Sequence, residues 1–334
     1  MQSYHVTRES GLTLREHPVP EPGPGRVLVR MRAAGLSFRD LLVLSGDYPL
    51  PVRPDVVAGC EGVGEVAALG AGVTGFAEGD RVALTVFPDW VDGPFGADRA
   101  AQLGTALDGT LTEYAVAAER GLVRIPEHLS YEEAAALPLT TLTAWHAVTG
   151  GRPLLPGETV LTLGTGAVSL AAVQLAVSAG ARVIATTSGP EKAGRLKALG
   201  AHEVIDRTEH PEWHVAVREL TDGRGADKTV HVAGELADSV RATALGGEVA
   251  YVGFRVGDAP AAQPVDARLL FGAGAAVRPL AVGSRAQFTA LNRALTVHGV
   301  RPVLDRVFPF AELPAALEHL GAGRAFGRVV VSHG

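Results

Sequence analysis

The segment VLTLGTGAVSLAAVQLA, residues 160–176, joins a short apolar strand to an alanine-rich helix through a turn that contains two glycines. Such a turn exposes backbone N–H groups at the positive end of the helix dipole, where a pyrophosphate binds favourably. A tight strand-to-helix turn without a ligand is the alternative interpretation. The strands and helices on either side favour a dinucleotide site, whose predicted contacts are Gly164, Thr165, Gly166, Ala167 and Val168.

Strand and helix signals continue at regular intervals after this turn. Short β-branched runs at 160–163, 182–187, 203–206, 227–232 and 248–253 alternate with helical segments that include 191–199 and 213–220. Such alternation builds a parallel sheet that is covered by helices on both faces. The sequence therefore predicts an α/β domain with a doubly wound parallel sheet. Ser169 replaces the usual Gly or Ala of the turn motif, so we expect this helix to lie slightly further from its strand.

The end of the next strand indicates which dinucleotide is bound. A free ribose 2′-hydroxyl is usually bound by an Asp or Glu about 20 residues past the glycines, and the segment ATTS at 185–188 contains no acid. Lys192, Arg195 and Arg207 lie close by in sequence and could instead pair with a 2′-phosphate, and Ser188 is a further predicted contact. We therefore expect NADPH as the cofactor. The alternative is that helix charges such as Lys192 and Arg195 are only solvated.

The first part of the chain has a different pattern. Up to about Arg124, short strands at 27–31, 62–69 and 80–84 alternate with turns rich in Pro and Gly, which predicts a mainly β region. Near the C-terminus we expect a helix at 285–298, a strand at 303–308, a helix at 313–320 and a strand at 328–331. These last elements could return to the first domain.

Composition and charge exclude several classes of protein. The chain has 334 residues, of which 47% are hydrophobic and 20% are charged, so two folded domains are expected. Its formal net charge of -6 argues against nucleic acid or an anionic membrane surface as a partner. No apolar run is long enough to cross a bilayer, so we expect a cytoplasmic location. Cys60 is the single cysteine, which excludes an internal disulfide and a four-cysteine zinc site.

Several longer motifs extend through nearly the whole chain. They are AAGLSFRDLLVLSGDYP (33–49), GCEGVGEVAALGAGVTGFAEGDRV (59–82), LTEYAVA (111–117), LPLTTLTAW (137–145), VLTLGTGAVSLAAVQLA (160–176), VRELTDGRGAD (217–227), GGEVAYVGF (246–254) and FGRVVV (326–331). In these motifs the chain resembles the medium-chain dehydrogenase/reductase superfamily, specifically its zinc-free quinone-oxidoreductase-like branch.

The resemblance implies a Rossmann doubly wound parallel sheet inserted in a GroES-like, mainly β catalytic domain. Residues 1–126 and 303–334 would form the GroES-like domain and residues 127–302 the Rossmann NADPH-binding domain, with the active site in the cleft between them. It also implies a homodimer, with the strand at 275–280 as a candidate pairing edge. Further cofactor contacts implied by motif position are Thr143, Gly253, Phe326 and Arg328. Thr143 could instead bond within its own helix.

Zinc-dependent members of the family hold a catalytic zinc with Cys, His and Cys. The matching positions here are Ser37, Cys60 and Leu139, with Glu61 next to Cys60. One thiol and one carboxylate do not complete a tetrahedral shell, so no metal site is expected. Cys60 is expected to be a small buried core residue.

Without a Lewis acid, oxidation of a simple alcohol is poorly supported. We therefore expect an oxidoreductase that transfers hydride to an enone, an enoyl thioester or a quinone. The resulting oxyanion needs hydrogen-bond donors and a proton, and the resemblance suggests Tyr48 and Ser37 as catalytic residues. Family members commonly have Asn where Ser37 stands, and Tyr48 could simply pack beside the neighbouring prolines. A metal-free carbonyl or alcohol dehydrogenase and a non-catalytic NADPH-binding protein are the alternatives.

Two segments could cover the cleft, the loop at 87–106 and the connection at 254–270. The aromatic residues Phe87, Trp90 and Phe95 in the loop are typical either of an apolar lid or of core contacts. The sequence leaves both interpretations open.

Overall fold

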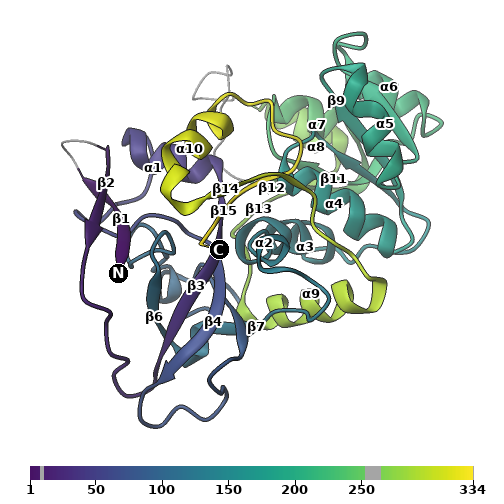
Figure 1. Cartoon of the computed structure of the whole chain (residues 1–334). Coiled ribbons are helices and arrows are strands. Elements are labelled where there is room, and N and C mark those ends of the chain that lie inside the picture. Colours follow the sequence, from purple (N-terminus) through teal and green to yellow (C-terminus); the bar gives the residue numbers. More distant parts are fainter. Residues whose placement is uncertain (8–10, 253–264, 334) are drawn as a thin grey trace. The chain divides into compact units, whose positions relative to one another are not determined.

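The structure is a computed structural model, and it describes residues 1–7, 11–252 and 265–333 (Figure 1). The chain divides into two compact units. Unit 1 contains Met1–Leu142 and Val282–Gly334, and unit 2 contains Thr143–Ala281. The chain therefore crosses between the units after Leu142 and after Ala281, whereas the boundaries were expected after residues 126 and 302.

Unit 2 is built on a six-stranded parallel sheet with the order β10-β9-β8-β11-β12-β13. The strands are β8 (Thr159–Thr162), β9 (Arg182–Thr187), β10 (Glu203–Asp206), β11 (Ala226–His231), β12 (Thr243–Val252) and β13 (Ala276–Leu280). The strand order reverses between β8 and β11, as in doubly wound dinucleotide-binding folds. The predicted doubly wound sheet is confirmed.

Helices cover this sheet because its strands are apolar on both faces. They are α3 (Leu142–Thr149), α4 (Ala167–Ser178), α5 (Pro190–Ala198), α6 (Trp213–Glu219), α7 (Leu236–Ala242) and α8 (Ala267–Ala273). Helix α4 packs on β8 and β9, α5 on β9 and β10, and α7 on β11 and β12. One core cluster joins Leu161, Ile184 and Trp213.

Unit 1 contains a seven-stranded sheet with the order β14-β15-β3-β4-β5-β7, in which β6 also pairs with β3, and a two-stranded sheet of β1 and β2. The strands are β1 (Gln2–Thr7), β2 (Gly11–Glu16), β3 (Arg26–Leu36), β4 (Gly62–Leu69), β5 (Arg81–Leu84), β6 (Tyr114–Ala118), β7 (Leu122–Arg124), β14 (Leu304–Pro309) and β15 (Arg328–Ser332). Strand β15 pairs antiparallel with β3, so the end of the chain completes the sheet begun near its start (Figure 1).

The helices of unit 1 are α1 (Phe38–Ser45), α2 (Tyr131–Ala134), α9 (Arg285–His298) and α10 (Leu313–Gly321), with the π-helical turn η3 (Leu137–Thr141) and the 3-10 turns η1 (Ala97–Arg99), η2 (Glu119–Gly121) and η4 (Phe310–Glu312). Helix α9 was expected in the inserted domain but packs against β7. Its Arg285 Nε donates to the carbonyl oxygen of Leu122 at 3.0 Å, and its Asn292 Nδ2 donates to that of Arg124 at 2.8 Å. Among the described helices, none is both long and apolar enough to span a membrane.

The aromatic residues of the loop before η1 pack on one another inside unit 1. The ring centroid of Phe95 lies 5.0 Å from that of Phe87 and 4.7 Å from that of Trp90. Trp90 is buried, and its Nε1 donates to the carbonyl oxygen of Gly93 at 2.8 Å. Phe87 and Trp90 are buried, whereas Phe95 is 43% exposed.

Candidate functional site

The glycine turn between β8 and α4 has the conformation that a dinucleotide site requires. Gly164 has a φ of +75°, a left-handed conformation that glycine adopts without strain, and its N–H donates to Thr186 Oγ1 at 3.0 Å. A Cβ atom added at Gly164 or Gly166 would meet no atom within 4 Å. Helix α4 begins after Gly166 with no side-chain cap. An anion can therefore approach the first N–H groups of α4.

Ser169 fits into this turn because its hydroxyl is satisfied locally. The side chain is buried, and Oγ donates to the carbonyl oxygen of Leu163 at 2.7 Å. This bond ties the first turn of α4 to the end of β8. Serine at the third position of the motif is therefore compatible with close packing of helix and strand.

The ends of β9 and β10 bring two of the predicted 2′-phosphate contacts together. Thr187 pairs with Asp206, and the N–H of Arg207 donates to the carbonyl oxygen of Thr187 at 2.9 Å. Ser188 and Arg207 therefore leave the sheet at adjacent strand ends, and Ser188 is exposed. Burial lowers the pKa of Arg207, whose Nε has no hydrogen-bond partner among the described residues.

The acid at the end of β10 accepts local hydrogen bonds, and the third predicted 2′-phosphate contact lies on α5. Asp206 Oδ1 accepts hydrogen bonds from the N–H and the hydroxyl of Thr208 at 2.9 and 2.8 Å. Lys192 lies in the first turn of α5 and is half-buried. Two cationic residues, Lys192 and Arg207, thus follow β9 and β10, and β9 itself ends without an Asp or Glu.

The remaining predicted cofactor contacts differ in their surroundings. Thr143 is buried at the start of unit 2, and Gly253 lies outside the described residues. Phe326 is buried in unit 1, where its N–H donates to Asp305 Oδ1 at 2.8 Å. The side chain of Arg328 is buried and pairs with Glu61. The geometry thus directs the guanidinium of Arg328 to a carboxylate of its own unit.

Glu61 is the centre of a buried polar network that was not predicted from the sequence. It is fully buried and accepts hydrogen bonds from the N–H of Leu139 at 2.7 Å and from the N–H and hydroxyl of Thr140 at 3.3 and 3.4 Å. Burial lowers the pKa of its partner Arg328 to about 10, so this guanidinium keeps its charge at neutral pH. Glu61 therefore fixes the turn η3 just before the chain crosses into unit 2.

The residues at the three positions that the resemblance matches to zinc ligands have other surroundings here. Ser37 caps α1, and its Oγ donates to Asp40 Oδ2 at 2.7 Å. Cys60 is buried, and burial raises the pKa of its thiol to about 11. Leu139 offers no side-chain donor. Within the described ranges, no three His, Cys, Asp or Glu side chains are placed to hold a metal ion.

Tyr48 has polar and cationic neighbours within unit 1. Gln102 Nε2 donates to the Tyr48 hydroxyl at 3.1 Å, and Gln102 Oε1 lies 3.4 Å from the same oxygen. The guanidinium of Arg39 lies over the Tyr48 ring, 5.2 Å from its centroid. Arg39 was not predicted as a site residue, although it lies in the motif GLSFRDLL. Tyr48 is thus placed beside a cation and an amide that orients its hydroxyl.

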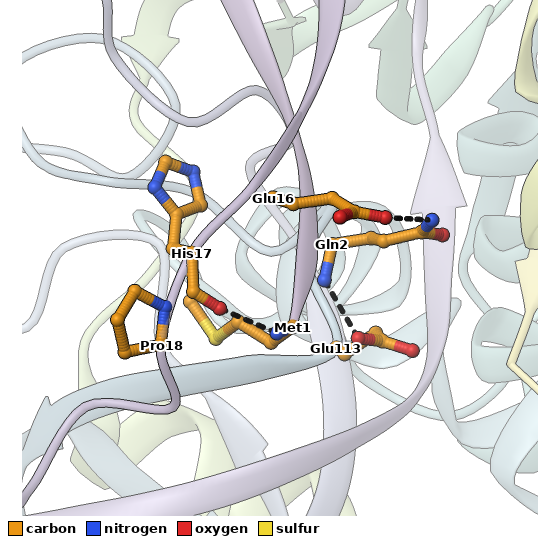
Figure 2. A pocket seen from close by; sticks show the side chains of 6 residues that line it. All are labelled: Met1, Gln2, Glu16, His17, Pro18 and Glu113. Carbon is orange, nitrogen blue, oxygen red and sulfur yellow. Dashed lines mark hydrogen bonds between the residues drawn. The ribbon is translucent and has the colours of Figure 1, made fainter.

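A pocket of about 600 Å³ lies elsewhere in unit 1 and contains none of the predicted site residues (Figure 2). Its polar groups bond to one another. The amino group of Met1 donates to the carbonyl oxygen of His17 at 2.5 Å, and the N–H of Gln2 donates to Glu113 Oε2 at 2.6 Å. None of the residues that line this pocket belongs to the dinucleotide turn, and none is Tyr48.

Comparison with known proteins places both units in one family. Residues 23–127 match the model of the alcohol dehydrogenase GroES-like domain, and residues 167–296 match that of zinc-binding dehydrogenases. A zinc-type alcohol dehydrogenase-like protein of Schizosaccharomyces pombe is 36% identical over 324 residues, which are 95% of this chain and 93% of that protein.

Solved structures agree with these matches. The structure of an NAD-dependent alcohol dehydrogenase has a TM-score of 0.87 and 36% identity, with 100% of both chains covered. The quinone oxidoreductase of Thermus thermophilus, whose complex with NADPH is also known, has a TM-score of 0.77 and 32% identity over 99% of this chain and 100% of that chain. With the strand order and glycine turn described above, the chain belongs to the medium-chain dehydrogenase/reductase superfamily, in its quinone-oxidoreductase-like branch.

Proposed function

We propose that this oxidoreductase uses NADPH, works without zinc, and transfers hydride to an activated double bond or a quinone. The observation that carries the proposal is the set of residues at the zinc positions. Ser37, Cys60 and Leu139 cannot supply the donors of a tetrahedral zinc site, whereas the dinucleotide-binding unit is intact. Without a metal to stabilise an alkoxide, the better substrate is one that can delocalise the negative charge left by hydride addition.

The residues of unit 2 fit a bound dinucleotide. The open turn at Gly164 and Gly166, together with the uncapped start of α4, suits the pyrophosphate. The 2′-phosphate would be held by Ser188 and Arg207 at the adjacent strand ends, with Lys192 nearby in sequence. No acid at the end of β9 competes with that phosphate. These features support NADPH over NADH.

When bound, NADPH supplies the hydride, and it leaves as NADP⁺. An enone or enoyl thioester accepts the hydride at its β-carbon, so that the double-bond electrons move toward the carbonyl and leave an enolate. A quinone accepts the same hydride and leaves a hydroquinone anion. In either case the Tyr48 hydroxyl donates a hydrogen bond and then its proton, and water restores that proton. Ser37 is less suited to this role because its hydroxyl donates to the Asp40 carboxylate at 2.7 Å, whereas the Tyr48 hydroxyl donates to the neutral Gln102 Oε1 at 3.4 Å.

The test is a panel of acceptors in the presence of NADPH or NADH: a benzoquinone, a naphthoquinone, an alkyl enone, an enoyl thioester and a simple ketone. Each reaction is followed by the loss of reduced-cofactor absorbance, with and without a chelator. We expect chelator-insensitive turnover with NADPH on a quinone, the enone or the thioester. Tyr48→Phe should lower kcat while leaving the affinity for NADPH unchanged.

Other outcomes would replace the proposal. Turnover of the ketone alone would indicate a metal-free carbonyl or alcohol dehydrogenase. Tight NADPH binding without turnover of any acceptor would favour a non-catalytic NADPH-binding protein. Loss of turnover in chelator, with recovery on added zinc, would contradict zinc independence.

A homodimer is the quaternary structure we propose. Strand β13 is the last strand of the unit 2 sheet, so its outer edge can pair with a second copy. Phe271 and Leu245 are 91% and 80% exposed on the same unit. Light scattering should give twice the chain mass, and Val277→Arg in β13 should lower it to that of a monomer. A monomeric wild-type chain would contradict the proposal.

A further inference from the structure

Arg39 is a cation of unit 1 that donates hydrogen bonds to neutral oxygen atoms. It lies in the first turn of α1, and its Nη2 donates to the carbonyl oxygen of Leu103 at 2.8 Å and to Thr105 Oγ1 at 3.4 Å. Its Nε and Nη1 have no solvent contact and no hydrogen-bond partner among the described residues. Buried arginines are usually paired with an acid. Two donor atoms of Arg39, Nε and Nη1, therefore have no acceptor at hydrogen-bonding distance among the described residues.

The groups around Arg39 leave its charge in place. The nearby acid Asp40 accepts from the N–H and the hydroxyl of Ser37, each at 2.7 Å, and so caps α1. The thiol of Cys60, whose pKa burial raises to about 11, is neutral at pH 7. Although burial acts to lower it, the pKa of Arg39 is raised by Cys60, Tyr48 and Asp40. The guanidinium is thus a permanent positive charge.

This charge lies over the ring of the tyrosine whose hydroxyl the proposed reaction uses. The guanidinium covers the Tyr48 ring at 5.2 Å, and Gln102 donates to the Tyr48 hydroxyl at 3.1 Å. We propose that Arg39 and Tyr48 act as one oxyanion-stabilising pair, in which Tyr48 contacts the substrate oxygen and Arg39 supplies the positive charge. This inference rests on the proposed function. It assigns to the Arg39 guanidinium the stabilisation of negative charge that a metal ion supplies in zinc-dependent dehydrogenases.

The charge balance of the step is simple. Hydride addition places one negative charge on the enolate or hydroquinone oxygen, and a fixed cation nearby stabilises that charge without reorganisation. Transfer of the Tyr48 proton to the substrate oxygen then gives an enol or a hydroquinone and moves the negative charge to the Tyr48 side chain, whose ring lies under the Arg39 guanidinium. The enol tautomerises in water: its α-carbon takes up a solvent proton, and its hydroxyl proton returns to solvent. Water returns a proton to Tyr48. Arg39 acts through Tyr48 and is therefore a positioning residue.

The experiment uses para-nitrophenol as the probe, because its phenolate mimics an enolate oxygen and absorbs differently from the phenol. The full chain saturated with NADP⁺ is titrated at a pH near the probe's own ionisation, and the phenolate fraction of the bound probe is read from its spectrum. We expect the wild-type chain to bind the phenolate preferentially, and Arg39→Met to weaken phenolate binding about tenfold or more. Arg39→Lys should recover part of the effect.

Two further variants distinguish the loss of the Arg39 charge from a general loss of structure. Arg120→Met is the matched control, since Arg120 is an exposed unit 1 arginine paired with Asp89, and it should not change the spectrum. Arg39→Gln keeps an N–H donor for the Leu103 carbonyl while removing the charge, so it should lose phenolate binding as Arg39→Met does. Circular dichroism and NADPH affinity confirm that each variant is folded.

An equal phenolate fraction in the wild type and in both neutral variants would overturn the inference, as would a wild-type chain that does not favour the phenolate. Activity gives an independent readout: kcat for the best acceptor should fall about 100-fold in Arg39→Met, with KM for NADPH unchanged. If no acceptor is reduced but phenolate binding depends on Arg39, the pair stands and the proposed reaction fails. If acceptors are reduced at an unchanged rate without Arg39, the reaction stands and the pair fails.

Discussion

Breaking the ion pair between Glu61 and Arg328 should destabilise unit 1 at the turn η3. Glu61 is fully buried and Arg328 is 5% exposed, so Glu61→Gln leaves a buried cation without an anion. Removal of one partner of a buried pair typically costs about 3–5 kcal/mol. We expect about 3 kcal/mol, because glutamine still accepts from the N–H groups of Leu139 and Thr140. Arg328→Met should cost less, since Glu61 keeps its other donors.

The assay is hydrogen exchange of the Leu139 and Thr140 amides, which donate to Glu61. A loss of about 3 kcal/mol corresponds to about 100-fold faster exchange under native conditions. The double variant carries no unpaired buried charge, so its loss should be close to that of one single variant and smaller than their sum. Unchanged exchange in Glu61→Gln, or strictly additive losses in the double variant, would refute the reasoning.

Three other predictions concern the cofactor and pH. Gly166→Val should leave the thermal midpoint of the free chain nearly unchanged, because a Cβ there meets nothing, but should weaken NADPH binding about tenfold or more; unchanged affinity in calorimetry would contradict this. Arg207→Gln should raise KM for NADPH about 10- to 100-fold and leave KM for NADH alone, and equal effects on both cofactors would argue against a 2′-phosphate contact. Burial lowers the pKa of His231 to about 4, whereas the unfolded chain binds that proton near pH ~6.5. The free energy of unfolding should therefore fall by up to about 3 kcal/mol as the pH falls from about 6.5 to about 4. Urea titrations should show a weaker pH dependence of this free energy in His231→Gln. An unchanged pH dependence in the variant would show that the loss of stability arises elsewhere.

Local patterns predicted much of unit 2. Strands β9 and β10 have the predicted bounds because β-branched runs between turns are strong local signals. The glycine turn was predictable for the same reason, since its function depends on backbone conformation within a few residues. The start of β12 at Thr243 and helix α7 were missed, as neither has a clear period in the sequence.

Long-range contacts were less predictable. Helix α9 has the predicted bounds, but periodicity shows only that Phe288, Leu291 and Leu295 form an apolar face and does not show that the helix packs against β7. The pair of Glu61 and Arg328 exists because β15 returns to pair with β3, beside β4. No local pattern contains that pairing.

The surroundings of Arg39 could not be predicted either, because they also depend on contacts between segments far apart in the sequence. An arginine in the first turn of a helix is usually an exposed charge, and here the loop at Leu103 and Thr105 contacts its guanidinium. Ser37 shows the opposite case. It was a candidate proton donor by motif position, and its hydroxyl donates to Asp40 Oδ2.

The most direct test of the central claim is to follow the transferred hydrogen itself. The chain, freed of metal by dialysis against a chelator, is incubated with an enone and NADPH that carries deuterium at the transferring carbon. The account predicts one deuterium at the β-carbon of the product and a solvent-derived proton at the α-carbon. Product without deuterium at the β-carbon, or no product until zinc is restored, would contradict it.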